Sequence, residues 1–146
     1  MTRSCLFVGV LSVLTLSSHA FAEAPSGRYT YPANGTVYDT RTKLTWQREA
    51  EETEYTQSDA ASYCTSLSLA GGGWRLPSVD ELLTLIDPTE YNPAVDPTAF
   101  PNARSGSCWS STPYVGMAGH MWIVYFLEGF ANRSSVSIKW YARCVR

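Results

Sequence analysis

The segment from residue 87 to residue 106 is rich in oxygen-bearing side chains that could bind a cation. Asp87, Glu90, Asn92 and Asp96 follow one another closely there, among four prolines. Calcium prefers several carboxylate and amide oxygens, but the spacing does not match a helix–loop–helix calcium site. The same residue types also bond their own backbone in turns. We therefore expect turn chemistry and no cofactor, with calcium as the alternative.

Little else in the sequence could carry out catalysis. His120 is the only histidine after residue 22, whereas zinc enzymes use several histidine, cysteine or carboxylate ligands. Cys108 and His120 could in principle form a nucleophile pair, but no third residue that would orient them is identifiable. The Gly-x-Ser-x-Gly motif of hydrolases does not occur. We predict a protein that is not an enzyme.

Aromatic and amide side chains in the second half of the chain could instead bind a ligand. We predict that Trp74, Trp109 and Trp122 pack in the core, because aromatic side chains dominate core packing. Tyr114 lies in a loop bounded by proline and glycine, where binding residues concentrate. The predicted ligand-binding residues are Tyr91, Asn92, Arg104, Tyr114, His120, Asn132, Arg133 and Trp140.

The first 22 residues have the pattern of an export signal. Arg3 supplies a positive start, and an apolar stretch over residues 5–16 is too short for a stable membrane span. Ala20 and Ala22 place small residues just before the expected cleavage, which follows Ala22. We predict a signal peptide over residues 1–22 and a protein of the periplasm or the extracellular space. The rest of the sequence contains no apolar segment of membrane length.

Composition limits the class of partner. The formal net charge is −2, and loss of Arg3 with the signal would make the mature chain more acidic. Nucleic acid requires a basic surface, so we predict no nucleic-acid partner.

Three cysteines follow the predicted signal: Cys64, Cys108 and Cys144. An exported protein is expected to form a disulfide. We favour Cys64–Cys144, which would close a loop of about 80 residues, and leave Cys108 as a free thiol. Pairs that include Cys108 remain open at this stage.

Local patterns predict the elements that must position these residues. Thr56 is the expected N-cap of a first helix that ends at the glycines from residue 71, and Ser78 with Glu81 predicts a capping box for a second helix. The second helix should bury Val79, Leu82, Leu83 and Ile86. Strands are predicted at 27–31, 36–39, 43–47, 107–111, 121–128, 134–138 and 139–145. This order indicates an α+β domain over residues 27–146.

Seven blocks of the sequence form a recognisable set: Gly35–Asp39, Leu44–Gln47, Ala60–Cys64, Trp74–Ser78 with Glu81 and Leu82, Trp109–Thr112, Phe126 with Gly129, and Arg143–Arg146. Together they resemble the Lcl C-terminal domain-like family of exported bacterial proteins. The resemblance implies a C-type-lectin-like fold, in which two helices flank a mostly antiparallel sheet, the N- and C-terminal strands are adjacent and a long loop carries ligand sites. It also implies the Cys64–Cys144 disulfide.

The family is named after a collagen-like adhesin whose C-terminal domain trimerises and binds sulfated glycans. The present chain has no collagen repeat and is acidic, which argues against a sulfated polyanion. We expect a secreted recognition or adhesion domain that binds a surface glycan or an envelope protein. The alternatives are an assembly subunit of the cell envelope, with Cys108 cross-linking a homo-oligomer, and, least favoured, an enzyme.

Overall fold

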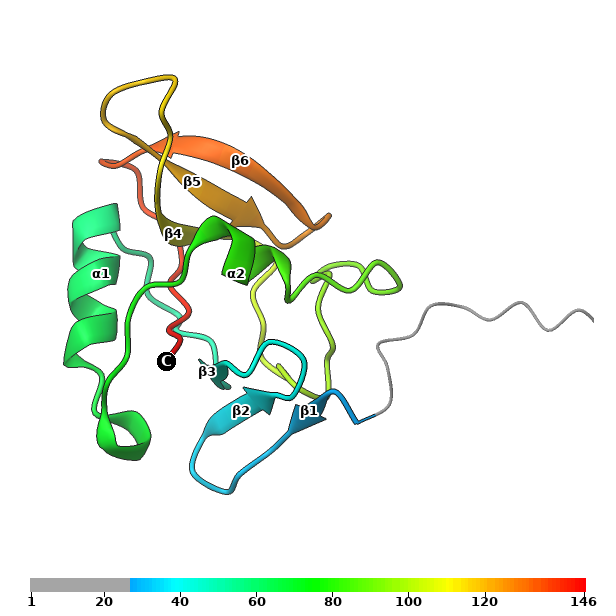
Figure 1. The fold of residues 1–146 in the computed structure, drawn as a ribbon. Coiled ribbons are helices and arrows are strands. Elements are labelled where there is room, and N and C mark those ends of the chain that lie inside the picture. Colours follow the sequence, from blue (N-terminus) through cyan, green and yellow to red (C-terminus); the bar gives the residue numbers. More distant parts are fainter. Residues whose placement is uncertain (1–26) are drawn as a thin grey trace, which may run out of the picture.

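The computed structural model describes residues 27–146, and the predicted signal peptide lies outside the described residues (Figure 1). Two three-stranded antiparallel sheets and two α-helices confirm the α+β class, although the strands form two sheets and not one. None of the helices in this part of the chain has the length and apolar character that crossing a bilayer requires.

The first sheet is a small hairpin extended by a third strand. Its strands are β1 (Tyr29–Thr30), β2 (Thr36–Asp39) and β3 (Thr45–Gln47), in that order. The buried pair of Arg28 and Asp39 lies beside it, with 2.7 Å between guanidinium and carboxylate. Arg28 also donates to the backbone oxygen of Thr84, which ties this sheet to the end of the second helix.

Both helices begin where local capping residues predict. Helix α1 (Gln57–Ser66) starts after Thr56, whose side chain accepts a hydrogen bond from the backbone of Asp59. Helix α2 (Val79–Leu83) has the predicted capping box between Ser78 and Glu81. The prediction that Leu83 is buried is wrong. The helix has only five residues, so its single buried stripe passes through Leu82, and Leu83 faces solvent.

The second sheet contains β4 (Ser107–Pro113), β5 (His120–Tyr125) and β6 (Phe130–Ser135), with β5 in the centre. Val124 packs in one hydrophobic cluster and its neighbour Ile123 in another. Successive residues of a strand face opposite sides, so the sheet separates the two clusters. Both faces of β5 are therefore covered by hydrophobic residues at these two positions. The strand predicted over residues 134–138 is instead β6, over residues 130–135, because it pairs with β5 from Phe130 opposite Tyr125 to Ser135 opposite His120. Such register is a long-range property that the local pattern does not contain.

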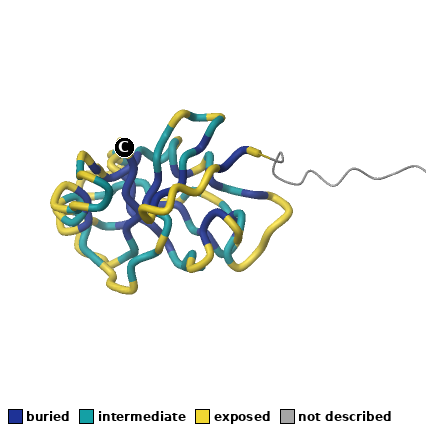
Figure 2. Tube along the Cα trace, turned by 90° about the horizontal axis from the view of Figure 1, so that it is seen from below, coloured by how far each residue is buried: buried dark blue, intermediate teal, exposed yellow. Residues whose placement is uncertain are grey.

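The predicted strand over residues 139–145 is wrong. This segment makes isolated bridges to four separate places instead of one ladder: Trp140 pairs with Tyr55, Tyr141 with Cys108, and Val145 with both Trp46 and Arg75. The paired residues belong to different neighbouring segments, so no single continuous ladder forms. The result is a buried segment that runs through the centre of the fold (Figure 2).

The disulfide joins this central segment to α1. Cys64 and Cys144 are bridged, as predicted, across a sequence separation of 80 residues. The segment also lies beside β3, because Thr45 and Arg146 exchange two backbone hydrogen bonds of 2.8 and 2.9 Å. The C-terminal segment therefore lies beside the third strand of the first sheet, and not as a regular strand beside β1.

Candidate functional site

An aromatic group stands at the end of the second sheet where β4 turns into β5. The ring of Tyr114 meets the ring of Trp122 edge to face, with centroids 5.0 Å apart and an interplanar angle of 76°. The guanidinium carbon of Arg133 lies 5.3 Å from the centroid of the Tyr114 ring. We call these three residues the aromatic–arginine site.

Strand register positions the site. Trp122 of β5 lies opposite Arg133 of β6, so both side chains project from the same face of the sheet. Tyr114 directly follows β4, and its backbone N–H donates to the oxygen of His120 at 3.0 Å. A side chain at Gly116 would approach the Tyr114 ring to 2.8 Å. The absence of a side chain at Gly116 therefore leaves room for the ring.

The guanidinium of Arg133 differs from the others that lie over aromatic rings. Those of Arg28, Arg48, Arg143 and Arg146 each donate at least one hydrogen bond to a protein oxygen. The guanidinium of Arg133 donates none to any acceptor in residues 27–146, and only its backbone N–H is bonded. It is a stacked arginine whose side-chain donors remain available to a ligand.

Two of the predicted ligand-binding residues lie at the far end of the sheet. Asn92 donates its backbone N–H to Leu127, in the turn between β5 and β6, at 3.1 Å. Its neighbour Tyr91 is exposed there. The aromatic–arginine site is at the opposite end of β5, so the single binding face predicted from the sequence is not formed.

Arg104 lies in a third region, between the segment before β4 and the loop after β3. It pairs with Glu52 at 2.7 Å, and both line a polar hollow of about 360 Å³ with Asn102. Asn102 also bonds to Glu49. These contacts fasten the segment before β4 to the acidic loop that follows β3.

The other three predicted residues lie near the aromatic–arginine site without joining it. The Nδ1 atom of His120 is 3.2 Å from the oxygen of Ala118, within the β4–β5 loop. Asn132 uses its side-chain oxygen to accept from the backbone N–H of Arg133. Trp140 donates its indole N–H to the Ser134 hydroxyl at 2.8 Å. Because Ser134 and Asn132 alternate with Arg133, their side chains project from the opposite face.

The four oxygen-bearing residues considered for calcium do not form a cluster. Asp87 accepts from the backbone and the hydroxyl of Thr89, and Asp96 accepts from the backbones of Thr98 and Ala99. The predicted turn role is confirmed for both aspartates. In the described part of the chain, no three His, Cys, Asp or Glu side chains come together at a spacing that could hold a metal ion.

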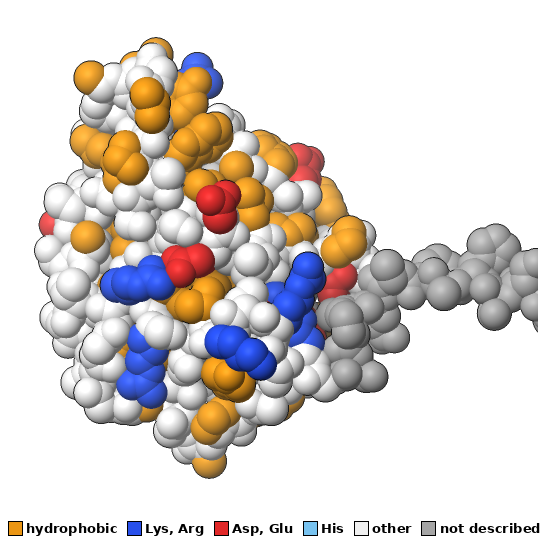
Figure 3. Space-filling model, in the orientation of Figure 1, with side chains coloured by type: hydrophobic (Ala, Val, Ile, Leu, Met, Phe, Trp, Pro, Cys, Tyr) orange, Lys and Arg blue, Asp and Glu red, His pale blue; other side chains and the backbone are white. Residues whose placement is uncertain are grey.

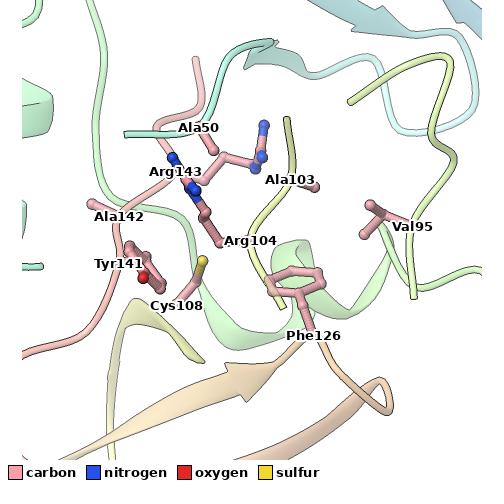
Figure 4. Close-up of a pocket in the computed structure, with 9 residues that line it drawn as sticks. All are labelled: Ala50, Val95, Ala103, Arg104, Cys108, Phe126, Tyr141, Ala142 and Arg143. Carbon is pink, nitrogen blue, oxygen red and sulfur yellow. The ribbon is translucent and has the colours of Figure 1, made fainter. Parts of the chain in front are cut away.

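Cys108 is the free thiol, as predicted, and it lies in a small apolar pocket. Its sulfur points between Tyr141 and Phe126 (Figure 4). The residue is only 5% exposed, and burial raises the pKa of the thiol to about 11 against the opposing charge of Arg143. The thiol is therefore protonated at neutral pH and shielded from other chains.

The structure does not bring Cys108 and His120 together. Cys108 pairs with Val124, four residues further along β5 than His120. At about 3.3 Å per residue, this separation is about 13 Å. The two side chains are thus too far apart to share a proton in this arrangement.

Arg75 and Arg143 bond to other parts of the framework. Arg75 makes a two-pronged contact with Glu81, with distances of 2.8 and 2.6 Å. Arg143 donates to the backbone oxygens of Gln47 and Arg48.

Sequence reasoning missed Trp122 as a site residue and assigned it to the core. It is in fact half-buried and faces Tyr114. Its alternation with Ile123 and Val124 shows only that it lies in a strand. The register with β6, which places Arg133 opposite, is a long-range property that the local pattern does not contain.

Comparison with known families supports the resemblance seen in the sequence. The Lcl C-terminal domain matches residues 35–146, which is most of the chain and all of the elements described here except β1. No curated protein matches the chain. The chain therefore belongs to the Lcl C-terminal domain family.

Proposed function

We propose that this protein is an exported, non-enzymatic recognition domain that binds a surface glycan at the aromatic–arginine site. The observation that carries the proposal is the guanidinium of Arg133, which is stacked over Tyr114 while none of its donors bonds to residues 27–146. A protein of the cell envelope is the alternative partner.

The chemistry of the site suits a sugar. The apolar faces of sugar rings pack against aromatic side chains such as Tyr114 and Trp122, and sugar hydroxyls accept hydrogen bonds from a guanidinium. Two of the three residues stand on paired strands, and the backbone N–H of the third, Tyr114, donates to His120. A site held this rigidly loses little conformational entropy when it binds.

We also propose that the domain has a C-type-lectin-like fold. A C-type-lectin-like fold is supported by the two helices, by the long irregular segment before β4 and by the C-terminal segment beside β3. Export is supported by the Cys64–Cys144 disulfide, because disulfides persist in oxidising compartments. The protein would then act in the periplasm or outside the cell.

The two alternatives from the sequence gain no support from the geometry. An assembly subunit cross-linked through Cys108 would require a 5% exposed thiol to leave its pocket. An enzyme that used Cys108 and His120 would require a rearrangement of the second sheet.

A glycan array tests the proposal. The wild-type domain and the Arg133→Ala, Tyr114→Ala and Arg41→Ala variants would be compared on the same array. Arg41 is the matched control, since it is exposed on a distant turn and its guanidinium also donates to no acceptor in residues 27–146. We expect Arg133→Ala to weaken binding by about tenfold or more, from loss of charged hydrogen bonds.

Arg41→Ala should retain the binding of the wild-type domain. An array on which no glycan is retained, or on which the Arg41 and Arg133 variants lose signal equally, would contradict the proposal. A pull-down from envelope extract with the same variants would then test the protein partner.

A further inference from the structure

The aromatic–arginine site contains hydrogen-bond donors that the rest of the domain does not use. The indole N–H groups of Trp109 and Trp140 each donate to a protein oxygen. Trp122 is half-buried, and its indole N–H donates to no acceptor in residues 27–146. The guanidinium of Arg133 is in the same condition. Two side chains of one site therefore present free N–H groups.

The free groups of this site are donors and not acceptors. An indole has one N–H donor, a guanidinium has five, and neither side chain contains an acceptor. The hydroxyl of Tyr114 can donate and accept, and it makes no hydrogen bond within residues 27–146. A sugar hydroxyl also donates and accepts, so a site for a neutral sugar has to supply acceptors as well. A site dominated by donors instead suits a group that only accepts, such as a carboxylate.

Arg133 also lacks a carboxylate partner within the described part of the chain. The ion pairs there are formed by Arg28, Arg75 and Arg104. The planar fork of a guanidinium binds a carboxylate through two parallel hydrogen bonds, and bonds between charged groups are about twice as strong as those between neutral groups. The charge of Arg133 is therefore available to an anionic group of a ligand.

The site lies on the face of the second sheet that α2 covers. Val124 packs in one hydrophobic cluster with Leu82 of α2, whereas Ile123 packs in the other with Ala60 of α1. Trp122 precedes Ile123 in β5, so its side chain shares the face of Val124 and α2. Helix α1 and the residues that lead into it are on the opposite side of the sheet.

The neighbouring acidic residues leave this face free for an anion. Asp59 belongs to α1, and Glu54 belongs to the segment that packs through Tyr55 against the cluster on the α1 side. Asp80 of α2 is exposed and is not paired with Arg133. At the end of the sheet beyond α2, the visible surface carries hydrophobic and basic side chains but no acidic one (Figure 3).

We infer that the glycan bound at the aromatic–arginine site carries a carboxylate on its sugar ring, as a uronic acid does. The inference rests on the proposed glycan recognition and names the class of sugar. Trp122 and Arg133 are opposite each other on paired strands, so their N–H groups can reach one carboxylate, while the sugar ring packs against Tyr114. One guanidinium in a chain of net charge −2 matches a single carboxylate, and not a densely sulfated chain.

NMR titration with matched sugars tests this inference. The ligands are the methyl glycosides of glucuronic, galacturonic and mannuronic acid, the primary amide of each acid, and the 6-sulfate of each parent sugar. The amide has the shape of the carboxylate but no charge, and it adds N–H donors that the indole and the guanidinium cannot accept. We expect at least one uronide to bind the wild-type domain about tenfold or more tightly than its own amide and its own sulfate.

Variants identify the residue that selects the carboxylate. Arg133→Ala should abolish the preference for the uronide over its amide. Arg133→Lys should reduce the preference to about threefold, because an ammonium keeps the charge but lacks the planar fork. Arg41→Ala is the matched control and should keep the full preference.

Failure of this inference is distinguishable from failure of glycan recognition. If every uronide binds only as tightly as its amide or its sulfate, or if the glycan array retains neutral sugars alone, the carboxylate inference is overturned and glycan recognition stands. Equal loss of preference in the Arg41 and Arg133 variants also overturns it. If no sugar binds in either experiment, both proposals are overturned.

Discussion

Two arginines that lie over aromatic rings serve different purposes in this protein. Arg146 lies 4.9 Å from the centre of the Trp74 ring and donates to the backbone oxygens of Ala70 and Gly72. Arg133 lies 5.3 Å from the centre of the Tyr114 ring, and its guanidinium donates to nothing in the described residues. Stacking alone therefore does not distinguish framework from site. The two arginines differ in whether their guanidinium N–H groups already donate hydrogen bonds within the described residues.

The same contrast extends to the regions around the two arginines. The framework around Arg146 includes the disulfide and the buried C-terminal segment, which bridges four places. The region around Arg133 is half-exposed and projects at the end of the sheet. Changes in the framework should lower stability, and changes at the aromatic–arginine site should lower affinity alone.

The largest effect is expected from removal of the disulfide. The double variant Cys64→Ser, Cys144→Ser frees a loop closed over 80 residues. In the chain-entropy treatment, this lowers the free energy of unfolding by about 4 kcal/mol. Urea denaturation measures the change, with Cys64–Cys144 intact in the reference protein. A loss below about 1 kcal/mol would show that the bridges of the C-terminal segment hold the framework without the disulfide.

Removal of one partner of the buried pair should have the next largest effect. Burial opposes ionisation of Asp39, but the hydrogen bonds from Arg28 and the Arg41 backbone hold the pKa of Asp39 below its ordinary value. The carboxylate therefore stabilises the fold above its unfolded pKa of about 4, and this stability is lost as pH falls through the lower folded pKa. Asp39→Asn should cost about 3 kcal/mol at neutral pH.

The loss should shrink as the solution is acidified, because protonation removes the same charge in the wild-type domain. Unfolding measured from pH 6 down to pH 2 checks this. Parallel pH profiles of the wild-type domain and the variant would contradict the assigned role of Asp39.

A substitution at Gly116 tests the difference between framework and ligand site at the aromatic–arginine site. Gly116→Ala places a methyl group 2.8 Å from the present position of the Tyr114 ring, which must move. We expect glycan affinity to fall by about 1 kcal/mol, because the ring no longer stacks as before, while stability changes by less than about 0.5 kcal/mol. Calorimetric titration and urea denaturation give the two numbers. A loss of stability with unchanged affinity would place Tyr114 in the framework.

The smallest effect is expected at the free thiol. Cys108 is buried, and burial raises its pKa to about 11, so an aromatic disulfide reagent should not react with the native domain at neutral pH. The thiol should react fully in denaturant. Rapid reaction under native conditions would show that the pocket opens. A disulfide between two chains through Cys108, as the assembly alternative requires, would then be possible.

The sequence predicted what local chemistry determines. Thr56, Ser78 and Glu81 place both helix starts because a cap and the backbone it bonds lie within three residues of each other. The C-terminal strand was predicted wrongly because bridges to partners from Trp46 to Cys108 depend on the packed fold. The site follows the same division. Tyr114 and Arg133 were identified individually by residue type, but their contact requires the register of β5 with β6.

One paired measurement tests the central distinction most directly. The Arg133→Ala and Arg146→Ala variants would be compared for affinity, toward the glycan that the wild-type domain retains best, and for free energy of unfolding. We predict that Arg133→Ala loses about tenfold or more in affinity with stability unchanged, and that Arg146→Ala loses about 1 kcal/mol of stability and keeps its affinity. Equal losses of affinity in the two variants, or a larger loss of stability in Arg133→Ala, would contradict the distinction between used and available donors.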